Sequence, residues 1–235
     1  MAIKNIEKLI EAMRQAEQDV KKALEEGLDV SKMVSISEGN TKMGKVASVS
    51  LLPILTCPGR CNGTCGEKCY AKKLAILRPS VAKAYARNTA IARLAPFDFF
   101  RAVQDTMRKV QYFRFHVSGD IPNIDYFRMV RYLCKTIPTC QVLMFTKRYE
   151  IVNANIEDFG KLPSNLHCLF SGWTNLSPTE GGYNPNRLPE TTVYAKEKDI
   201  NPEWTLCGGN CLDCAIHDGG CWNAKPGETI AFKIH

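Results

Sequence analysis

Eight of the eleven cysteines fall into two groups whose spacing could support metal chemistry. The first group places a cysteine at every fourth position of residues 57–70, namely Cys57, Cys61, Cys65 and Cys69. Pro58 and several glycines interrupt this stretch, which favours a loop over a helix. A loop that gathers four thiols around one point is typical of a metal ion or an iron–sulfur cluster.

The second group lies near the C-terminus and consists of Cys207, Cys211, Cys214 and Cys221. Zinc sites favour paired two-residue spacings, whereas cubane clusters accept three close ligands and one more distant. Neither group has the layout of a zinc ribbon, so we expect a [4Fe-4S] cluster at each group, with zinc as the alternative at the second. The remaining three thiols stand singly on predicted helices and strands and are expected to be packing residues: Cys134, Cys140 and Cys168.

A third candidate site is the segment from Arg114 to Asp120. Its alternation places the apolar residues on one face of a strand and Arg114, His116 and Ser118 on the other. In a barrel the apolar face packs against outer helices and the polar face lines the lumen. We therefore expect Arg114 and His116 to face a substrate, together with Lys147, which follows another predicted strand.

The elements that must position these residues alternate between strands and helices. An amphipathic helix is predicted over residues 4–26, and later helices are predicted from Pro79, Asp98 and Asn123 and near residues 150–159. Strands are predicted at residues 47–56, 112–117, 141–146, 166–171, 191–195 and 229–234. About six strands joined by helical crossovers predict an α/β fold, a partial (β/α) barrel of mostly parallel strands with outer helices and cysteine-rich loops.

Length and composition are consistent with this fold. The chain has 235 residues, of which 45% are hydrophobic, enough for a substantial core. We expect an N-terminal helical extension over residues 1–30 and an iron–sulfur domain over residues 31–235, with a C-terminal cluster-binding segment at 205–225. The first thirty residues lack the apolar core of a signal peptide, and no apolar run approaches the roughly 20 residues of a membrane span. A cytoplasmic protein with reduced thiols and no membrane partner is therefore expected.

Positive charge is concentrated in one third of the chain. Residues 57–115 contain twelve Lys and Arg against three Asp and Glu, a net charge of +9, whereas the whole chain carries +7. This segment could face nucleic acid, could compensate the negative charge of thiolate-bound clusters, or could form solvated helix faces. The charge pattern alone leaves these three interpretations open.

The order of these features resembles the start of a radical S-adenosylmethionine (SAM) barrel. In that family a three-cysteine loop after the first strand holds a [4Fe-4S] cluster, and a glycine-rich acidic motif after the second strand binds the amino group of SAM. The resemblance implies that Ser118, Gly119 and Asp120 contact SAM. Here every gap in the first cysteine group has three residues, and its fourth cysteine could close the cluster to SAM.

A closer resemblance is to the phage "gene product 88" family, over residues 37–235. The matching stretches are Gly39–Gly44, Thr56–Gly59, Cys69–Ala71, His116–Asp120, Cys207–Trp222 and Phe232–His235. This resemblance implies a phage or mobile-element protein with a cluster-binding domain and implies no particular reaction.

Three functions remain open at this point. The chain could be a radical-SAM-like enzyme that acts on an unknown substrate. It could be a non-enzymatic or electron-transfer protein with two fully ligated clusters. It could also be a zinc-stabilised protein that binds nucleic acid through residues 57–115, in which case binding would depend strongly on salt.

Overall fold

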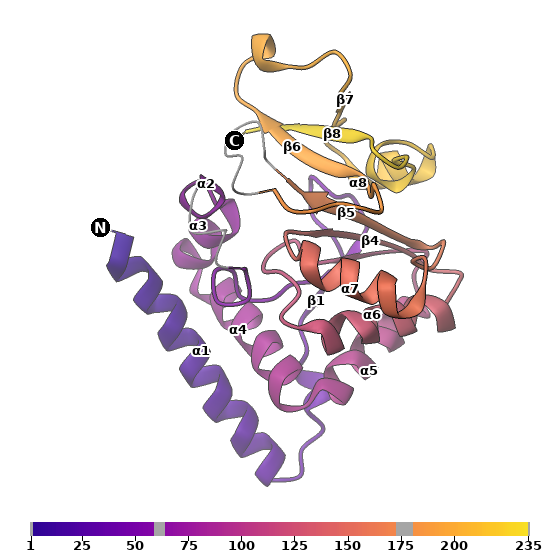
Figure 1. The fold of residues 1–235 in the computed structure, drawn as a ribbon. Coiled ribbons are helices and arrows are strands. Elements are labelled where there is room, and N and C mark those ends of the chain that lie inside the picture. The colour runs from indigo at the N-terminus through magenta and orange to yellow at the C-terminus, as the bar shows by residue number, and fades with distance from the viewer. Residues whose placement is uncertain (1, 59–63, 173–180, 235) are drawn as a thin grey trace.

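The computed structural model describes residues 2–58, 64–172 and 181–234, and its centre is one open sheet (Figure 1). The strands are ordered β1-β2-β3-β4-β5-β6-β8-β7, and every neighbouring pair is parallel except β1 and β2. Their bounds are β1 (Ile36–Ser37), β2 (Ala47–Val49), β3 (Tyr112–Phe115), β4 (Gln141–Thr146), β5 (Leu166–Ser171), β6 (Glu190–Tyr194), β7 (Thr205–Leu206) and β8 (Thr229–Lys233).

The sheet confirms the mostly parallel α/β prediction but has eight strands instead of about six. The two additional strands, β1 and β7, have two residues each, which is too short to produce a periodic pattern in the sequence. β1 and β7 form the two edges of the sheet and do not pair with each other. The sheet is therefore not closed, and the predicted barrel form is not established.

Most helices lie between consecutive strands and cover one face of the sheet (Figure 1). The helices are α1 (Ala2–Glu25), α2 (Thr64–Glu67), α3 (Tyr70–Leu77), α4 (Pro79–Leu94), α5 (Pro96–Met107), α6 (Ile124–Thr136), α7 (Tyr149–Phe159) and α8 (Cys211–Ile216), with 3-10 turns η1 (Val30–Met33), η4 (Glu197–Asp199) and η5 (Gly220–Trp222). Asn123 caps α6 as predicted, because its side chain accepts a hydrogen bond from the Tyr126 amide at 2.9 Å.

The helix-covered face contains the main hydrophobic core. Phe113 and Phe115 of β3 point into it, as their alternation predicts, and both are completely buried. Helix α1 contributes Leu9 and Val20 to the same core and packs along α4. Each such buried side chain stabilises the fold by about 1.5–3 kcal/mol. Residues of the expected N-terminal extension therefore share one core with the sheet.

The opposite face of the sheet carries a second, smaller core. Leu143 of β4 and Leu169 of β5 pack there with Met43 and Trp222. The segment 207–224 lies over this face, and its backbone is fixed to the loop before β2. The amides of Cys211 and Leu212 donate to the carbonyls of Lys42 and Met43, at 3.3 and 3.1 Å respectively. A covered face therefore replaces the open lumen that the sequence predicted.

Three local predictions are corrected by the backbone. β2 ends at Val49, and the chain turns through Ile54, which has a positive φ of 71°. β3 ends at Phe115 because His116 also adopts a positive φ, 60°, so the alternation expected up to residue 117 stops there. The cysteine groups are not wholly loops, since Cys65 lies in α2 and Cys211 begins α8.

Candidate metal centre

The second cysteine group is gathered by two short helical turns on the opposite face of the sheet. The Asn210 side chain caps α8 by accepting hydrogen bonds from the amides of Leu212 and Asp213. Cys211 and Cys214 then lie three residues apart on α8 and share one side of it. η5 carries Cys221, and Cys207 directly follows β7. All four thiols are half-buried and pack against the second core.

The surroundings of these four thiols are apolar and rigid. The Trp222 indole donates to the carbonyl of Cys211 at 2.8 Å, and its ring contacts Tyr112 and His167 edge-on, with ring centroids 5.4 and 5.7 Å apart. Burial is the main cause that raises the pKa of Cys207, Cys214 and Cys221, and neighbouring thiols of the group raise it further. Several thiols of the group are therefore close enough to influence one another.

Arg114 places a positive charge against this group. Its Nη1 lies 3.6 Å from the Sγ of Cys211 and 3.6 Å from the Sδ of Met43, and its guanidinium carbon lies 4.7 Å from the centre of the Phe145 ring. Its charge opposes the burial that raises the pKa of Cys207 and of the neighbouring Cys221. No carboxylate in the described part of the chain pairs with Arg114, and its buried Nε has no partner there.

The first cysteine group is described for Cys57, Cys65 and Cys69, whereas Cys61 lies outside the described residues. Cys69 is the N-cap of α3, and its Sγ accepts a hydrogen bond from the Lys72 amide at 3.3 Å. Burial raises the pKa of Cys69, and the charges of Cys65 and Cys57 raise it further. Cys57 and Cys65 therefore lie near enough to Cys69 for their charges to act on it.

Tyr70 lies between the two cysteine groups. Its hydroxyl donates to the carbonyl of Val117 at 2.5 Å, although 56% of the residue is exposed. Burial of the hydroxyl raises the pKa of Tyr70, while Arg114 lowers it and Cys69 and Cys211 each raise it. A cysteine of each group therefore affects the pKa of the same hydroxyl, so the two groups lie on the same side of the molecule.

The thiols are gathered but do not form a finished coordination sphere. Across the described ranges, no three Cys, His, Asp or Glu side chains are arranged as a metal site. The donor chemistry fits an iron–sulfur cluster or zinc, because four half-buried thiols of one group lie near one another. Metal binding would require the thiols to be deprotonated and arranged around the metal.

Asp120 joins the strand ends beside the first cysteine group. Its buried carboxylate accepts hydrogen bonds from the amides of Ile121 and Lys147, at 2.7 and 2.9 Å, and from the Thr146 hydroxyl at 2.5 Å. Its own amide donates to the hydroxyl of Thr56 at 3.1 Å. Burial raises the pKa of Asp120, and these donors oppose the rise. The carboxylate oxygens are already engaged in fixing the ends of β3 and β4.

Gly119 and Ser118 are also explained by packing. Gly119 has a φ of 79°, and a Cβ there would lie 2.6 Å from the Thr56 hydroxyl and 2.9 Å from the Leu51 carbonyl. The Ser118 carbonyl accepts a hydrogen bond from the Leu51 amide at 2.9 Å, and its buried hydroxyl has no partner within the described chain. The Ser-Gly-Asp motif therefore holds the segment before Cys57 against the sheet.

The residues predicted to face a substrate point into three different environments. Arg114 lies on the opposite face, as predicted. His116 does not share that face, because its positive φ turns the ring toward α6, where Nε2 lies 2.9 Å from the Tyr126 hydroxyl. Burial, with a smaller effect of Arg114, lowers the pKa of His116 to about 3, so the ring is neutral. The Lys147 ammonium is buried and donates to the Ser171 carbonyl at 2.5 Å.

Sequence reasoning missed the aromatic residues of both groups. Tyr70 directly follows Cys69, and Trp222 directly follows Cys221. An aromatic residue after the last cysteine of each group was the signal that could have identified them. The structure also brings together the three cysteines expected to stand singly, since Cys140 and Cys168 both act on the pKa of Cys134. All three are buried packing residues, as predicted.

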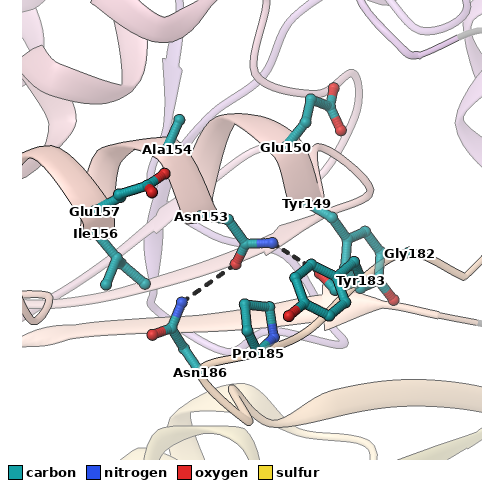
Figure 2. A pocket seen from close by; sticks show the side chains of 10 residues that line it. All are labelled: Tyr149, Glu150, Asn153, Ala154, Ile156, Glu157, Gly182, Tyr183, Pro185 and Asn186. Atoms are coloured by element: carbon teal, nitrogen blue, oxygen red, sulfur yellow. Dashed lines mark hydrogen bonds between the residues drawn. The ribbon is translucent and has the colours of Figure 1, made fainter.

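A groove of about 800 Å³ lies elsewhere, between α7 and residues 182–186 (Figure 2). The Asn153 side chain crosses it and donates to the Tyr183 carbonyl at 2.7 Å. None of its lining residues is a cysteine. The groove is therefore separate from the cysteine groups.

Comparison with known proteins gives one match. A family model described as Gene product 88 matches residues 9–221, a range that includes both cysteine groups. The searches of curated proteins and of solved structures give no match. No helix among the described residues is both long and apolar enough to cross a membrane.

Proposed function

The chain belongs to the phage Gene product 88 family, and we propose that it is an iron–sulfur protein of the host cytoplasm that holds one cluster at each cysteine group. The observation that carries this proposal is the contact between Arg114 and the second group. Four half-buried thiols pack against the second core, and the guanidinium Nη1 lies 3.6 Å from the Sγ of one of them.

A half-buried cation with no carboxylate partner in the described ranges is an unbalanced arrangement. Removing charge from water costs several kcal/mol unless an opposite charge is near. No such charge comes from a carboxylate within the described ranges, whereas four thiolates bound to an iron–sulfur cluster would supply net negative charge. The arrangement of Arg114 with Cys207, Cys211, Cys214 and Cys221 is thus suited to an anionic cluster.

In the first group, the feature that favours a cluster is the position of a thiol at a helix N-terminus. The Cys69 thiol caps α3, where the partial positive charge of a helix N-terminus favours a thiolate. Cys57 and Cys65 are its neighbours. Gly119 and Asp120 fix the chain immediately before Cys57 through Thr56, so the loop starts from a rigid point.

Metal analysis after anaerobic purification tests the proposal. We expect about eight irons and eight sulfides per chain for two cubanes, with little zinc. Cys214→Ser should lose about half of the iron, while Cys134→Ser, a thiol of the main core, should retain all of it. Colourless protein containing zinc, or equal iron loss in both variants, would overturn the proposal.

A radical-SAM-like enzyme is the second candidate. It is favoured by the order of β2 to β6, which are neighbours in chain order, and by the position of the first cysteine group after β2. In this case one iron of the first cluster would bind SAM, and the cluster would supply the electron that cleaves it. Asp120 is a poor partner for the SAM amino group, because Thr146, Lys147 and Ile121 occupy its carboxylate.

Two measurements separate this candidate from a closed electron-transfer protein. Calorimetry should detect SAM binding to the anaerobic protein, and the reduced protein should cleave SAM, only if an iron is open. In addition, one of the four first-group cysteines should then be dispensable for the cluster. Failure of SAM to bind to protein with both clusters present would remove the enzyme candidate and leave the iron–sulfur proposal intact.

Nucleic-acid binding through residues 57–115 receives less support from the structure. Arg93 pairs with Glu17 at 2.8 Å, and Arg101 pairs with Asp29 at 2.6 Å, so carboxylates from outside the segment neutralise part of its charge. Arg114 points to the cysteines instead of to solvent. Binding of duplex DNA or RNA that weakens steeply with salt would revive this interpretation.

A further inference from the structure

We infer that Arg114 sets the reduction potential of the cluster at the second cysteine group, an inference that rests on the proposed iron–sulfur function. Arg114 is the cation that contacts a thiol of this group, with its Nη1 3.6 Å from the Cys211 Sγ. It therefore acts on the cluster through a ligand, as a positioning and charge-tuning residue.

The guanidinium is held where it is by the sheet and by its neighbours. Arg114 lies on β3 between Ser48 of β2 and Leu143 of β4, so its backbone is in the interior of the sheet. Its guanidinium carbon lies 4.7 Å from the centre of the Phe145 ring, and its Nη1 lies 3.6 Å from the Met43 sulfur. Because the guanidinium is held in place, its electrostatic effect on the cluster is reduced little by side-chain motion.

The sign of the effect follows from electrostatics. Reduction adds a negative charge to the cluster, and a nearby cation stabilises that charge more than it stabilises the oxidised state. A hydrogen bond from N–H to a ligand sulfur acts in the same direction, and hydrogen bonds and exposure are known controls of cluster potentials. Arg114 should therefore raise the reduction potential of the second cluster.

Lys42 provides a matched comparison on the same group. Its charge also lowers the pKa of Cys207, but its side chain is exposed, whereas Arg114 is half-buried against the second core. Water and salt screen an exposed charge far more than a buried one. Lys42→Met and Arg114→Met remove the same charge from the two kinds of position.

The test is a redox titration followed by electron paramagnetic resonance on the anaerobically reconstituted full chain. The signal of the second cluster is the one that Cys214→Ser abolishes. For Arg114→Met we expect the equilibrium constant for reduction to fall at least tenfold, a negative shift of about 59 mV for a one-electron couple. Lys42→Met should shift the potential much less.

Arg114→Lys keeps the inference testable if the methionine variant does not fold. Lysine retains the charge but loses the planar donor over Phe145, so a smaller negative shift is expected. A fall of tenfold or more in the equilibrium constant for Arg114→Lys, which keeps the charge, or equal shifts in Arg114→Met and Lys42→Met, would overturn the role of Arg114. Wild-type protein without iron would instead overturn the proposed function, so the two failures are distinguishable.

Discussion

The two faces of the sheet each bring cysteines together, with opposite chemical consequences. On the helix-covered face Cys134, Cys140 and Cys168 are buried in the main core, and burial raises the pKa of Cys140 and Cys168 to about 12. On the opposite face the second cysteine group is half-buried. Proximity of thiols therefore does not by itself make a site.

The difference between the faces lies in charge and access. The Arg114 guanidinium contacts Cys211 on the opposite face, whereas Asp120 acts on Cys168 and raises its pKa further on the other. A cation beside accessible thiols favours thiolate and metal binding, and a carboxylate beside inaccessible thiols disfavours both.

Removal of metal should have the largest effect, and it should be confined to one face. If clusters hold the segment 207–224 in place, chelation of the reduced protein should abolish amide protection there, because binding free energy is also folding free energy. Hydrogen exchange with mass spectrometry measures this. The amides of α5 and α6 serve as the control and should retain protection. Equal loss on both faces would contradict the distinction.

The main core should tolerate truncation poorly while leaving metal binding unaffected. Phe113→Ala removes a completely buried ring from the helix-covered face and should cost about 3–5 kcal/mol of unfolding free energy, as large-to-small core changes do. Phe145→Ala, on the half-buried opposite face, should cost less. Denaturant unfolding gives both values. Iron per folded chain should stay at the wild-type level in Phe113→Ala.

Gly119→Ala should loosen the joint between the first cysteine group and the sheet. The substitution combines a left-handed backbone with close contacts to Thr56 and Leu51, and we expect a loss of about 2–4 kcal/mol. Gly27→Ala is the matched control, because Gly27, just after the end of α1, has a similar φ of 70° but open space around it. It should cost only about 1–2 kcal/mol. Similar losses in the two variants would mean that the contacts at Gly119 are unimportant.

His116 should make the smallest contribution, visible only in acid. Its pKa is about 3 in the folded chain against 6.5 for an ordinary histidine, so the unfolded chain takes up the proton first. The stabilisation is therefore present above pH 6.5 and is lost as the pH falls toward 3, by roughly 2 kcal/mol at pH 5. His116→Asn tolerates the positive φ and should flatten this part of the pH profile. The Tyr126 hydroxyl, 2.9 Å from Nε2 of His116, and the charge of Arg114 are the same in the wild type and the variant.

Sequence patterns predicted the elements that local signals define. β4 and β5 begin and end at the residues expected, because each is a short apolar run with turn residues beside it. Asn123 identified the start of α6. The cysteine groups were visible from spacing alone, although the helices α2 and α8 inside them were not.

The remaining features depend on contacts between distant parts of the chain. Arg114 and Cys211 are 97 residues apart, and no periodicity relates them. The His116 ring points toward α6 because the backbone of this residue has a positive φ where β3 ends. The sequence pattern around His116 does not predict that φ. The cover over the opposite face arises from segment 207–224 meeting the loop before β2, which alternation within β3 could not reveal.

That last contact has a consequence for how the chain is made. The amides of Cys211 and Leu212 donate to the carbonyls of Lys42 and Met43, so one face of the sheet is completed by a segment that is synthesised after strands β1 to β7. The helix-covered core can assemble once β5 has emerged, whereas the other face stays bare until Trp222 follows. A nascent chain therefore exposes an apolar surface until residues 207–224 have been synthesised, and only then do the four thiols of the second group come together.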